Sequence, residues 1–182
     1  MFVYVRNTRV GGNSLFHYVL KNGDIDNLIV NSLHCTFGEL LKFIPSVFYR
    51  VPDDEVKYIA TIREPFEHTV SYWMYDRQIT GRTHSLKYYL ENNICSICHL
   101  KQHLFIKHGN RFVDHIIRYE DGDTFQQVCN IIGHTPTENI RWASNRYDKK
   151  WYEYYTPETV DMVRNIFRDD FNILGYSMEF PR

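Results

Sequence analysis

The sequence predicts an α/β domain with a central, mostly parallel sheet flanked by helices in three layers. Short runs rich in β-branched and aromatic residues alternate along the chain with segments of helical spacing. One of these runs, Lys57–Ile62, is almost continuously apolar, which is typical of a strand covered on both faces. No linker, repeat or low-complexity tract interrupts the 182 residues, so we expect a single domain over residues 1–182.

The first elements alternate strand and helix. Phe2–Val5 is a predicted strand, and a glycine turn leads from it to a helix that opens at Ser14 and ends at an Asn-Gly pair. Leu28–Val30 is a second predicted strand. Phe37–Ile44 is predicted to form a helix that Pro45 terminates.

The third strand–helix pair is the most regular. After the strand Lys57–Ile62, Pro65 suits the first turn of a helix. The apolar residues expected along one side of this helix are Phe66, Val70, Trp73 and Met74.

The second half of the chain begins with a less regular, mainly helical stretch over residues 81–110. Val113–Tyr119 is a predicted strand. Asp123 is a candidate N-cap of a helix that Gly133 ends.

The remaining chain is predicted as loop over Thr135–Tyr155, followed by a helix. Thr156 offers a capping hydroxyl, Pro157 suits the first helical position, and Glu158 faces the positive end of the helix dipole. The side chains of this helix that we expect to be buried are Val160, Val163 and Phe167.

Charge and composition exclude several classes of protein. Lys plus Arg is 21 and Asp plus Glu is 22, so the formal net charge of −1 argues against a general nucleic-acid or membrane-surface binder. We expect no membrane span and no signal peptide, since apolar runs are short and charges follow the first residues at once. Four cysteines are too few for a disulfide scaffold, which favours a reducing, cytoplasmic location.

The glycine turn is a candidate anion site. The first amides of a helix lack intrahelical partners, and glycines let a phosphate approach the backbone closely. Arg9 supplies positive charge before Gly11 and Gly12. The alternative is an ordinary tight turn between strand and helix. It is not a Walker A loop, because the required spacing and lysine are absent.

A second candidate anion site follows the third strand. Arg63 leaves the carboxyl end of that strand, where open α/β sheets bind ligands, and Ser71 lies two turns into the next helix. The alternative is that Arg63 pairs with Glu64 or Glu67 at the surface and Ser71 merely packs.

Taken together, these segments resemble the sulfotransferases that use 3′-phosphoadenosine 5′-phosphosulfate (PAPS), in particular the carbohydrate branch. Thr8–Ser14 is similar to the family's turn P-K-x-G-[GS]-T-S, and Arg63–Trp73 to its motif R-[ND]-P-[FW]-x-R-x-x-S-x-[YF]. Further similar segments follow in the family's order: Arg118–Asp121, Trp151–Tyr155 and Phe167–Tyr176.

The resemblance implies a P-loop-like fold and a site for PAPS as co-substrate, without a metal. It implies that Arg63 and Ser71 bind the 3′-phosphate, and that the 5′-phosphosulfate is held by Arg9, Val10, Gly11, Gly12, Asn13, Ser14 and Leu15. Arg9 stands where the family has a catalytic lysine, Asn13 where it has threonine, and His68 where it has a second arginine.

The sequence also suggests a general base for the acceptor hydroxyl. His34 follows the second strand and can ionise near neutral pH, and the resembled branch often has a histidine here. Glu39 is the second choice, and a merely structural His34 is the alternative.

Cys95, Cys98 and His99 form a C-x-x-C-H pattern that occurs in haem attachment and, with further histidines, in zinc sites. Two small helix residues are the simpler interpretation. The basic and aromatic segment Asn139–Lys150 could stack on a base or sugar, or be a solvated loop.

The function that we expect is transfer of a sulfuryl group from PAPS to a hydroxylated acceptor, in particular a carbohydrate. One alternative is an inactive descendant of the family that binds the nucleotide or a sulfated glycan. Another is a small metal- or haem-binding module. A P-loop kinase is disfavoured because the Walker lysine is missing.

Overall fold

The computed structural model describes residues 1–7, 9–10, 12–22, 28–30, 35–47, 53–92, 101–137 and 148–181. The chain forms two compact units. Unit 1 comprises residues 1–62 and 104–142, and unit 2 comprises residues 63–103 and 143–182. The expectation of a single domain over residues 1–182 stays a prediction.

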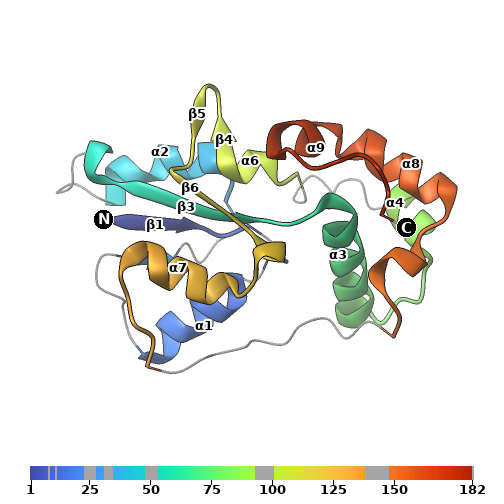
Figure 1. Ribbon diagram of the computed structural model, residues 1–182, viewed down its shortest axis with the longest axis horizontal. Helices are drawn as coiled ribbons and strands as arrows, with labels where there is room; N and C mark the ends of the chain where they lie inside the picture. Colours follow the sequence, from blue (N-terminus) through green and yellow to red (C-terminus); the bar gives the residue numbers. More distant parts are fainter. Residues whose placement is uncertain are drawn as a thin grey trace. The chain divides into compact units, whose positions relative to one another are not determined.

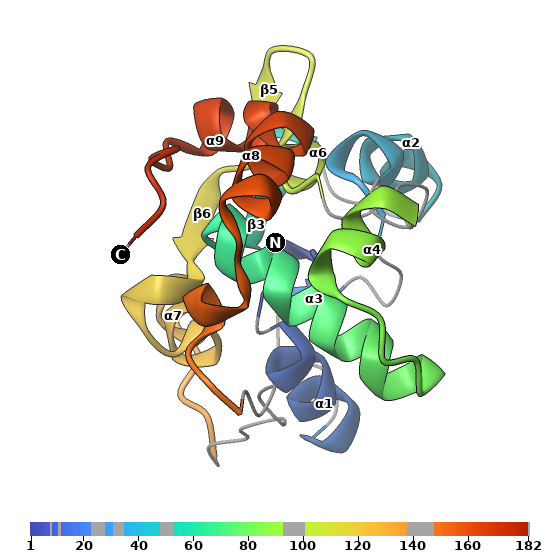
Figure 2. The same ribbon diagram turned by 90° about the vertical axis from the view of Figure 1, so that its right-hand side faces the viewer.

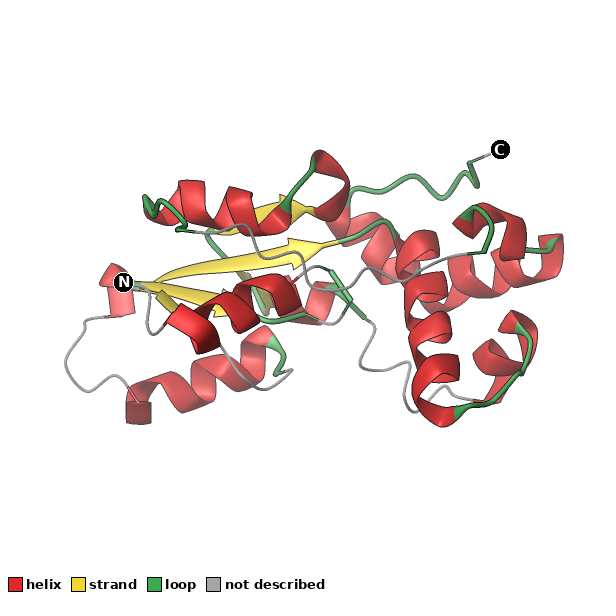
Figure 3. Cartoon of the chain, turned by 90° about the horizontal axis from the view of Figure 1, so that it is seen from below, coloured by secondary structure: helices red, strands yellow, loops and turns green. Residues whose placement is uncertain are grey.

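Unit 1 is built on a parallel sheet (Figures 1 and 3). Its four strands lie in the order β2-β1-β3-β6, and every neighbouring pair is parallel. The strands are β1 (Phe2–Val5), β2 (Leu28–Val30), β3 (Lys57–Ile62) and β6 (His115–Arg118). The predicted α/β class with a central parallel sheet is thereby confirmed.

Helices cover both faces of this sheet. In Figure 1, α1 (Gly12–Asn22) and α7 (Thr124–Ile132) lie on one face, and α2 (Phe37–Val47) lies on the other. Ile59 of β3 is fully buried because both of its neighbours in the sheet and a helical layer exclude water from it. The buried core beneath α1 and α7 consists of Tyr4, Leu15, Tyr18, Leu28, Ile59, Ile117, Phe125, Val128 and Cys129.

Short elements complete the description of unit 1. They are the 3₁₀ turns Asp53–Glu55 and Tyr119–Asp121, and a hairpin of β4 (Lys107–His108) and β5 (Arg111–Phe112). The hairpin follows α6 (His103–Ile106) and was not predicted. Two residues per strand carry too little alternation to be recognised from sequence.

Unit 2 is helical. Its elements are α3 (Pro65–Thr80), α4 (Leu86–Asn92), a 3₁₀ turn at Trp151–Tyr154, α8 (Pro157–Ile166) and α9 (Arg168–Leu174), seen from one end in Figure 2. Helices α3, α4 and α8 pack against one another. Their shared core consists of Phe66, Val70, Trp73, Leu86, Tyr89, Leu90, Val160, Val163, Phe167 and Phe171.

Two helices, α7 and α8, have the caps that the sequence predicts, whereas the predicted start of the first helix at Ser14 is wrong because α1 begins at Gly12. Asp123 accepts hydrogen bonds from the amides of Phe125 and Gln126, and Gly133 ends α7 in a left-handed conformation. Thr156 forms a capping box with Thr159 at the start of α8.

The predicted end of α2 at Pro45 is wrong. The helix continues through this residue to Val47. Pro45 has no amide hydrogen to donate to the carbonyl four residues earlier, so α2 lacks one hydrogen bond there, and only Ser46 and Val47 of the helix follow it.

Among the described residues, no helix is both long and apolar enough to cross a membrane. The cytoplasmic location expected from the sequence stays a prediction.

The Asp114 carboxylate stabilises the pairing of β3 with β6. Asp114, just before β6, accepts hydrogen bonds from the Tyr58 amide at 2.8 Å and from Lys57 Nζ at 3.2 Å. Burial acts to raise the pKa of Asp114, but these two hydrogen bonds and the nearby charges of Lys57 and His115 together outweigh it and lower the pKa overall. The carboxylate thus extends the β3–β6 pairing by one step beyond Ile59 and His115.

We expect Asp114→Ala to lower the free energy of unfolding by about 1 kcal/mol at pH 7, since solvent screens a partly exposed ion pair. A lowered pKa stabilises the native state above the ordinary Asp pKa of about 4, and this contribution disappears as pH falls through the folded-state pKa. Urea unfolding should therefore show a smaller difference between variant and wild type at pH 3. Asp54→Ala, at an exposed position, is the control; an equal difference at both pH values contradicts the assignment.

Candidate functional site

The strand order of unit 1 creates a switch point between β1 and β3. From β1 the chain continues to β2 on one side, whereas β3 adds on the other side of β1. Loops that leave the carboxyl ends of two such strands diverge, and open α/β sheets bind ligands in the resulting crevice. The glycine turn follows β1, and Arg63 is the residue that follows β3.

The start of the glycine turn is tied to β3. The Asn7 amide donates to the Val5 carbonyl at 3.0 Å, and the buried Asn7 side chain donates from Nδ2 to the Thr61 carbonyl at 3.3 Å. Val10 and Leu15 are fully buried, so the turn is anchored on the core at both ends. These contacts fix where the chain enters α1.

Arg9 adopts a left-handed backbone conformation, with φ of 58°. A non-glycine residue in this region costs about 1 kcal/mol, which the surrounding contacts must offset. Gly12, Asn13 and Ser14 form the first turn of α1, where helix amides are available to an anion. Thr8, Gly11 and the side chains of Asn13 and Ser14 lie outside the described residues.

Arginines gather at the carboxyl edge of the sheet in unit 1. The Arg6 guanidinium lies 4.3 Å from the centre of the Phe16 ring on α1. Arg118 ends β6, opposite Ile62 of β3. Arg9 follows β1 within the glycine turn. Arginine is a side chain suited to binding phosphate, so this edge is where we look for an anion site.

A buried hydroxyl pair lies beneath this edge. Tyr4 Oη and Thr61 Oγ1 are 2.8 Å apart, and both residues are fully buried. Burial raises the pKa of Tyr4 to about 12, although the hydrogen bond with Thr61 and the charge of Arg6 act in the opposite direction. Tyr4 therefore stays neutral at physiological pH and serves as a link between β1 and β3.

In unit 2, Arg63 is paired inside its own segment. Its guanidinium lies 2.7 Å from Glu67 Oε1, and Arg63 is only 6% exposed. The Glu64 side chain caps α3 by accepting from the Glu67 amide at 2.7 Å. The pairing given above as the alternative thus occurs, but in a largely buried setting rather than at the surface.

Ser71 lies on the same side of α3 as Glu67, because four residues make about one helical turn. Ser71 and His68 are both buried. Arg63 and Ser71 belong to unit 2 and the glycine turn to unit 1, so a shared ligand stays a prediction.

Two residues with no assigned role in the sequence analysis hold Arg63. The Arg63 amide donates to Gln102 Oε1 at 2.8 Å, and Gln102 Nε2 donates to the Arg63 carbonyl at 2.7 Å. Asp170 in turn accepts from the backbone amide of Gln102 at 2.9 Å. Asp170 stood in a segment similar to the sulfotransferases, but no sequence pattern linked it to Gln102.

Glu39, the second choice for the general base, has a structural role. Glu39 Oε2 accepts from the Thr36 amide at 2.7 Å and from the Thr36 hydroxyl at 2.8 Å, and the Glu39 amide donates back to that hydroxyl. This is a capping box at the start of α2. His34 lies outside the described residues.

The cysteine–histidine pattern Cys95, Cys98 and His99 also lies outside the described residues, as do residues 139–147 of the basic aromatic segment. Within the described ranges, no group of three or more His, Cys, Asp or Glu side chains is arranged to hold a metal ion.

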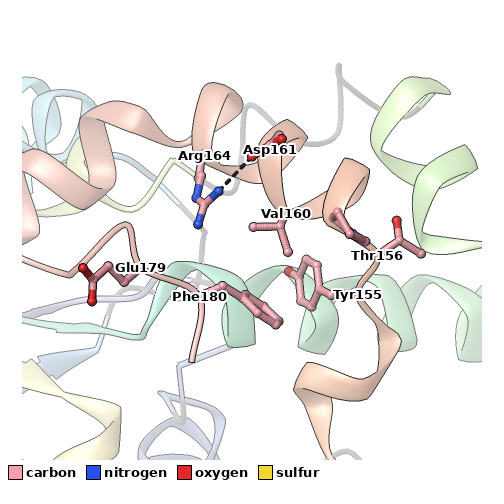
Figure 4. Close-up of a pocket in the computed structure, with 8 residues that line it drawn as sticks. Tyr155, Thr156, Val160, Asp161, Arg164, Glu179 and Phe180 are labelled. Atoms are coloured by element: carbon pink, nitrogen blue, oxygen red, sulfur yellow. Dashed lines mark hydrogen bonds and ion pairs between the residues drawn. The ribbon is translucent and has the colours of Figure 1, made fainter. Parts of the chain in front are cut away.

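Unit 2 contains an open cavity of about 680 Å³ (Figure 4). Arg164 is fixed at its wall, because Nε donates to the Met178 carbonyl at 2.9 Å and an amino group donates to Asp161 at 2.8 Å. None of the predicted site residues lines it. The lining residues are Tyr155, Thr156, Pro157, Val160, Asp161, Arg164, Glu179 and Phe180.

No family model, curated protein or solved structure matches the chain. The fold and the residues described above are therefore the basis on which a function can be proposed.

We expect Tyr4→Phe to lower the free energy of unfolding by about 1 kcal/mol at pH 8, because Thr61 loses its hydroxyl partner. Since the pKa of Tyr4 is raised, its neutral form stabilises the native state fully below the ordinary Tyr pKa of about 10, and this contribution is lost as pH rises toward 12. The advantage of wild type over the variant should therefore shrink by about 1 kcal/mol between pH 8 and pH 11.

Urea unfolding at the two pH values measures this change. Tyr75→Phe removes a tyrosine hydroxyl from an exposed residue and controls for the loss of one titrating group. A constant difference between wild type and Tyr4→Phe across this pH range contradicts the prediction.

Proposed function

We propose that this chain is a PAPS-dependent sulfotransferase with a P-loop-like fold. It transfers a sulfuryl group to a hydroxyl of an acceptor, for which a carbohydrate is the first candidate. We place this activity in the cytoplasm.

The observation that carries the proposal is the position of the two motif segments relative to the sheet. β1 and β3 are parallel neighbours on either side of the switch point. The glycine turn directly follows one strand, and Arg63 directly follows the other. This is the part of an open α/β sheet that binds nucleotides.

In the proposal, the glycine turn holds the 5′-phosphosulfate. Amides of the first turn of α1 donate to its oxygens, and Arg9 balances the charge that develops on the leaving phosphate. The left-handed backbone of Arg9 supports this role, because strained residues persist where a particular loop shape is required.

Arg63 and Ser71 bind the 3′-phosphate in the proposal. The guanidinium already has a carboxylate partner in Glu67, at 2.7 Å. Binding therefore requires the phosphate to compete with Glu67 for Arg63, which makes Glu67 a determinant of affinity.

The reaction is an in-line displacement at sulfur. The acceptor oxygen forms a bond to sulfur while the bond from sulfur to the bridging phosphate oxygen breaks. The products are the sulfated acceptor and 3′-phosphoadenosine 5′-phosphate. His34 accepts the proton of the acceptor hydroxyl, and the capping role of Glu39 supports this choice.

A thermal-shift titration with 3′-phosphoadenosine 5′-phosphate tests the binding step. Ligand that binds the native state raises the melting temperature of wild type, and Arg63→Ala should lose most of this shift. Glu67→Gln should instead tighten binding roughly tenfold, because it removes a negative charge a few ångströms from the phosphate.

Glu91→Gln is the matched control for Glu67→Gln. It removes a carboxylate from the same unit, where Glu91 pairs with Lys87 at 3.8 Å on α4. Equal ligand-induced shifts in wild type and Arg63→Ala contradict the assignment of Arg63.

Transfer is measured with ³⁵S-labelled PAPS and a panel of hydroxylated acceptors. We expect labelled product with wild type and at least a hundredfold less with His34→Ala. Nucleotide binding without transfer to any acceptor indicates a binding protein descended from such enzymes. Stoichiometric zinc or haem in the purified protein supports the metal-binding alternative.

A further inference from the structure

We propose that Gln102 and Asp170 are positioning residues that aim Arg63 at the 3′-phosphate. This inference rests on the proposed function and extends it to residues that do not touch the nucleotide.

The Gln102 side chain forms hydrogen bonds with both the amide and the carbonyl group of Arg63. Its Oε1 accepts from the Arg63 amide at 2.8 Å, and its Nε2 donates to the Arg63 carbonyl at 2.7 Å. Gln102 is fully buried, so water does not compete for these hydrogen bonds. A primary amide that pairs with one residue in this way reproduces the pairing offered by a neighbouring strand.

Gln102 contacts Arg63 at the point where the chain passes from β3 to α3. β3 pairs with β6 as far as Ile62 and Arg118, and α3 begins at Pro65. Arg63 therefore lies after the last paired residue of the strand and before the helix, where no regular element dictates its backbone. The Gln102 side chain supplies that constraint.

Asp170, on α9, holds the backbone of Gln102 in place. Its Oδ2 accepts from the Gln102 amide at 2.9 Å. Its Oδ1 accepts from the His103 amide at 2.9 Å and lies 2.5 Å from His103 Nδ1. With Asp170 fully buried, this carboxylate fixes the backbone that carries the Gln102 side chain.

The chain of contacts thus runs from Asp170 through Gln102 to the backbone of Arg63. The guanidinium end is held separately by Glu67 at 2.7 Å. When a phosphate displaces Glu67, the constraint of Gln102 on the Arg63 backbone remains. Arg63 then gives up less conformational freedom when the anion binds, and this preorganisation of the backbone increases affinity.

The test is a double-mutant cycle on binding of 3′-phosphoadenosine 5′-phosphate, measured by calorimetry. We expect Gln102→Ala to weaken binding about tenfold in the wild-type background and by less than twofold in the Arg63→Ala background. A merely structural role would weaken binding equally in both backgrounds, and that result overturns the proposal.

Gln78→Ala, at an exposed position on α3, is the matched control and should leave affinity unchanged. If Gln102→Ala does not fold, Gln102→Glu keeps the size and the acceptor but loses the donor to the Arg63 carbonyl. Its expected effect is smaller and has the same dependence on Arg63.

Hydrogen exchange of the Arg63 amide separates this proposal from the proposed function. Loss of protection at Arg63 in Gln102→Ala, with the core of α8 still protected, supports the constraint that Gln102 places on the Arg63 backbone, whether or not wild type binds the nucleotide. Absence of nucleotide binding by wild type contradicts the proposed function, and with it the part that this constraint plays in binding. Unchanged protection at Arg63 overturns the positioning role.

Discussion

Parallel pairing is the constraint on which unit 1 depends. Parallel strands must all end at one edge, and each return to the opposite edge requires a crossover, here with helices on both faces of the sheet. With β1 between β2 and β3, the loops after β1 and β3 leave the same edge from adjacent strands. Asn7 and the Tyr4–Thr61 pair then fix these two strand ends with side-chain hydrogen bonds. The chemistry that we assign to this edge follows from this arrangement rather than from any one motif.

Buried polar groups organise unit 2 in a different way. Asp170, Gln102 and Arg63 are all at most 6% exposed, and leaving any of their polar groups unsatisfied would be costly. Each hydrogen bond in the chain therefore restricts where the next group can lie. The Arg63–Glu67 pair adds a charge that an incoming anion must displace. Glu67 thus stabilises the free protein by pairing with Arg63 but lowers the affinity for an anion. Such a trade-off between stability and binding is common at functional sites.

The sequence was sufficient for the four strands of the parallel sheet and for several helix ends, because apolar runs and caps are local signals. Lys57–Ile62 and the caps at Asp123 and Thr156 are examples. It misjudged Pro45, where position within the helix decides the cost of a proline. For the candidate site, it singled out the Arg63 segment, whose role in binding stays a prediction, and it gave Glu67 as one of two acidic residues that could pair with Arg63. It gave no role to Gln102 or Asp170, because hydrogen bonds across 39 and 68 residues leave no periodic trace.

The contact between Gln102 and Asp170 has a consequence for protein synthesis. Ribosomes release a chain from its amino end, so α3 emerges long before α9. The amides of Gln102 and His103 must wait for a carboxylate that follows 68 and 67 residues later. Arg63 consequently acquires its final geometry only after α9 has been synthesised. A nascent chain that stops before α9 would leave the core of unit 2 incomplete. The apolar side chains exposed in that state are the kind of surface that molecular chaperones bind.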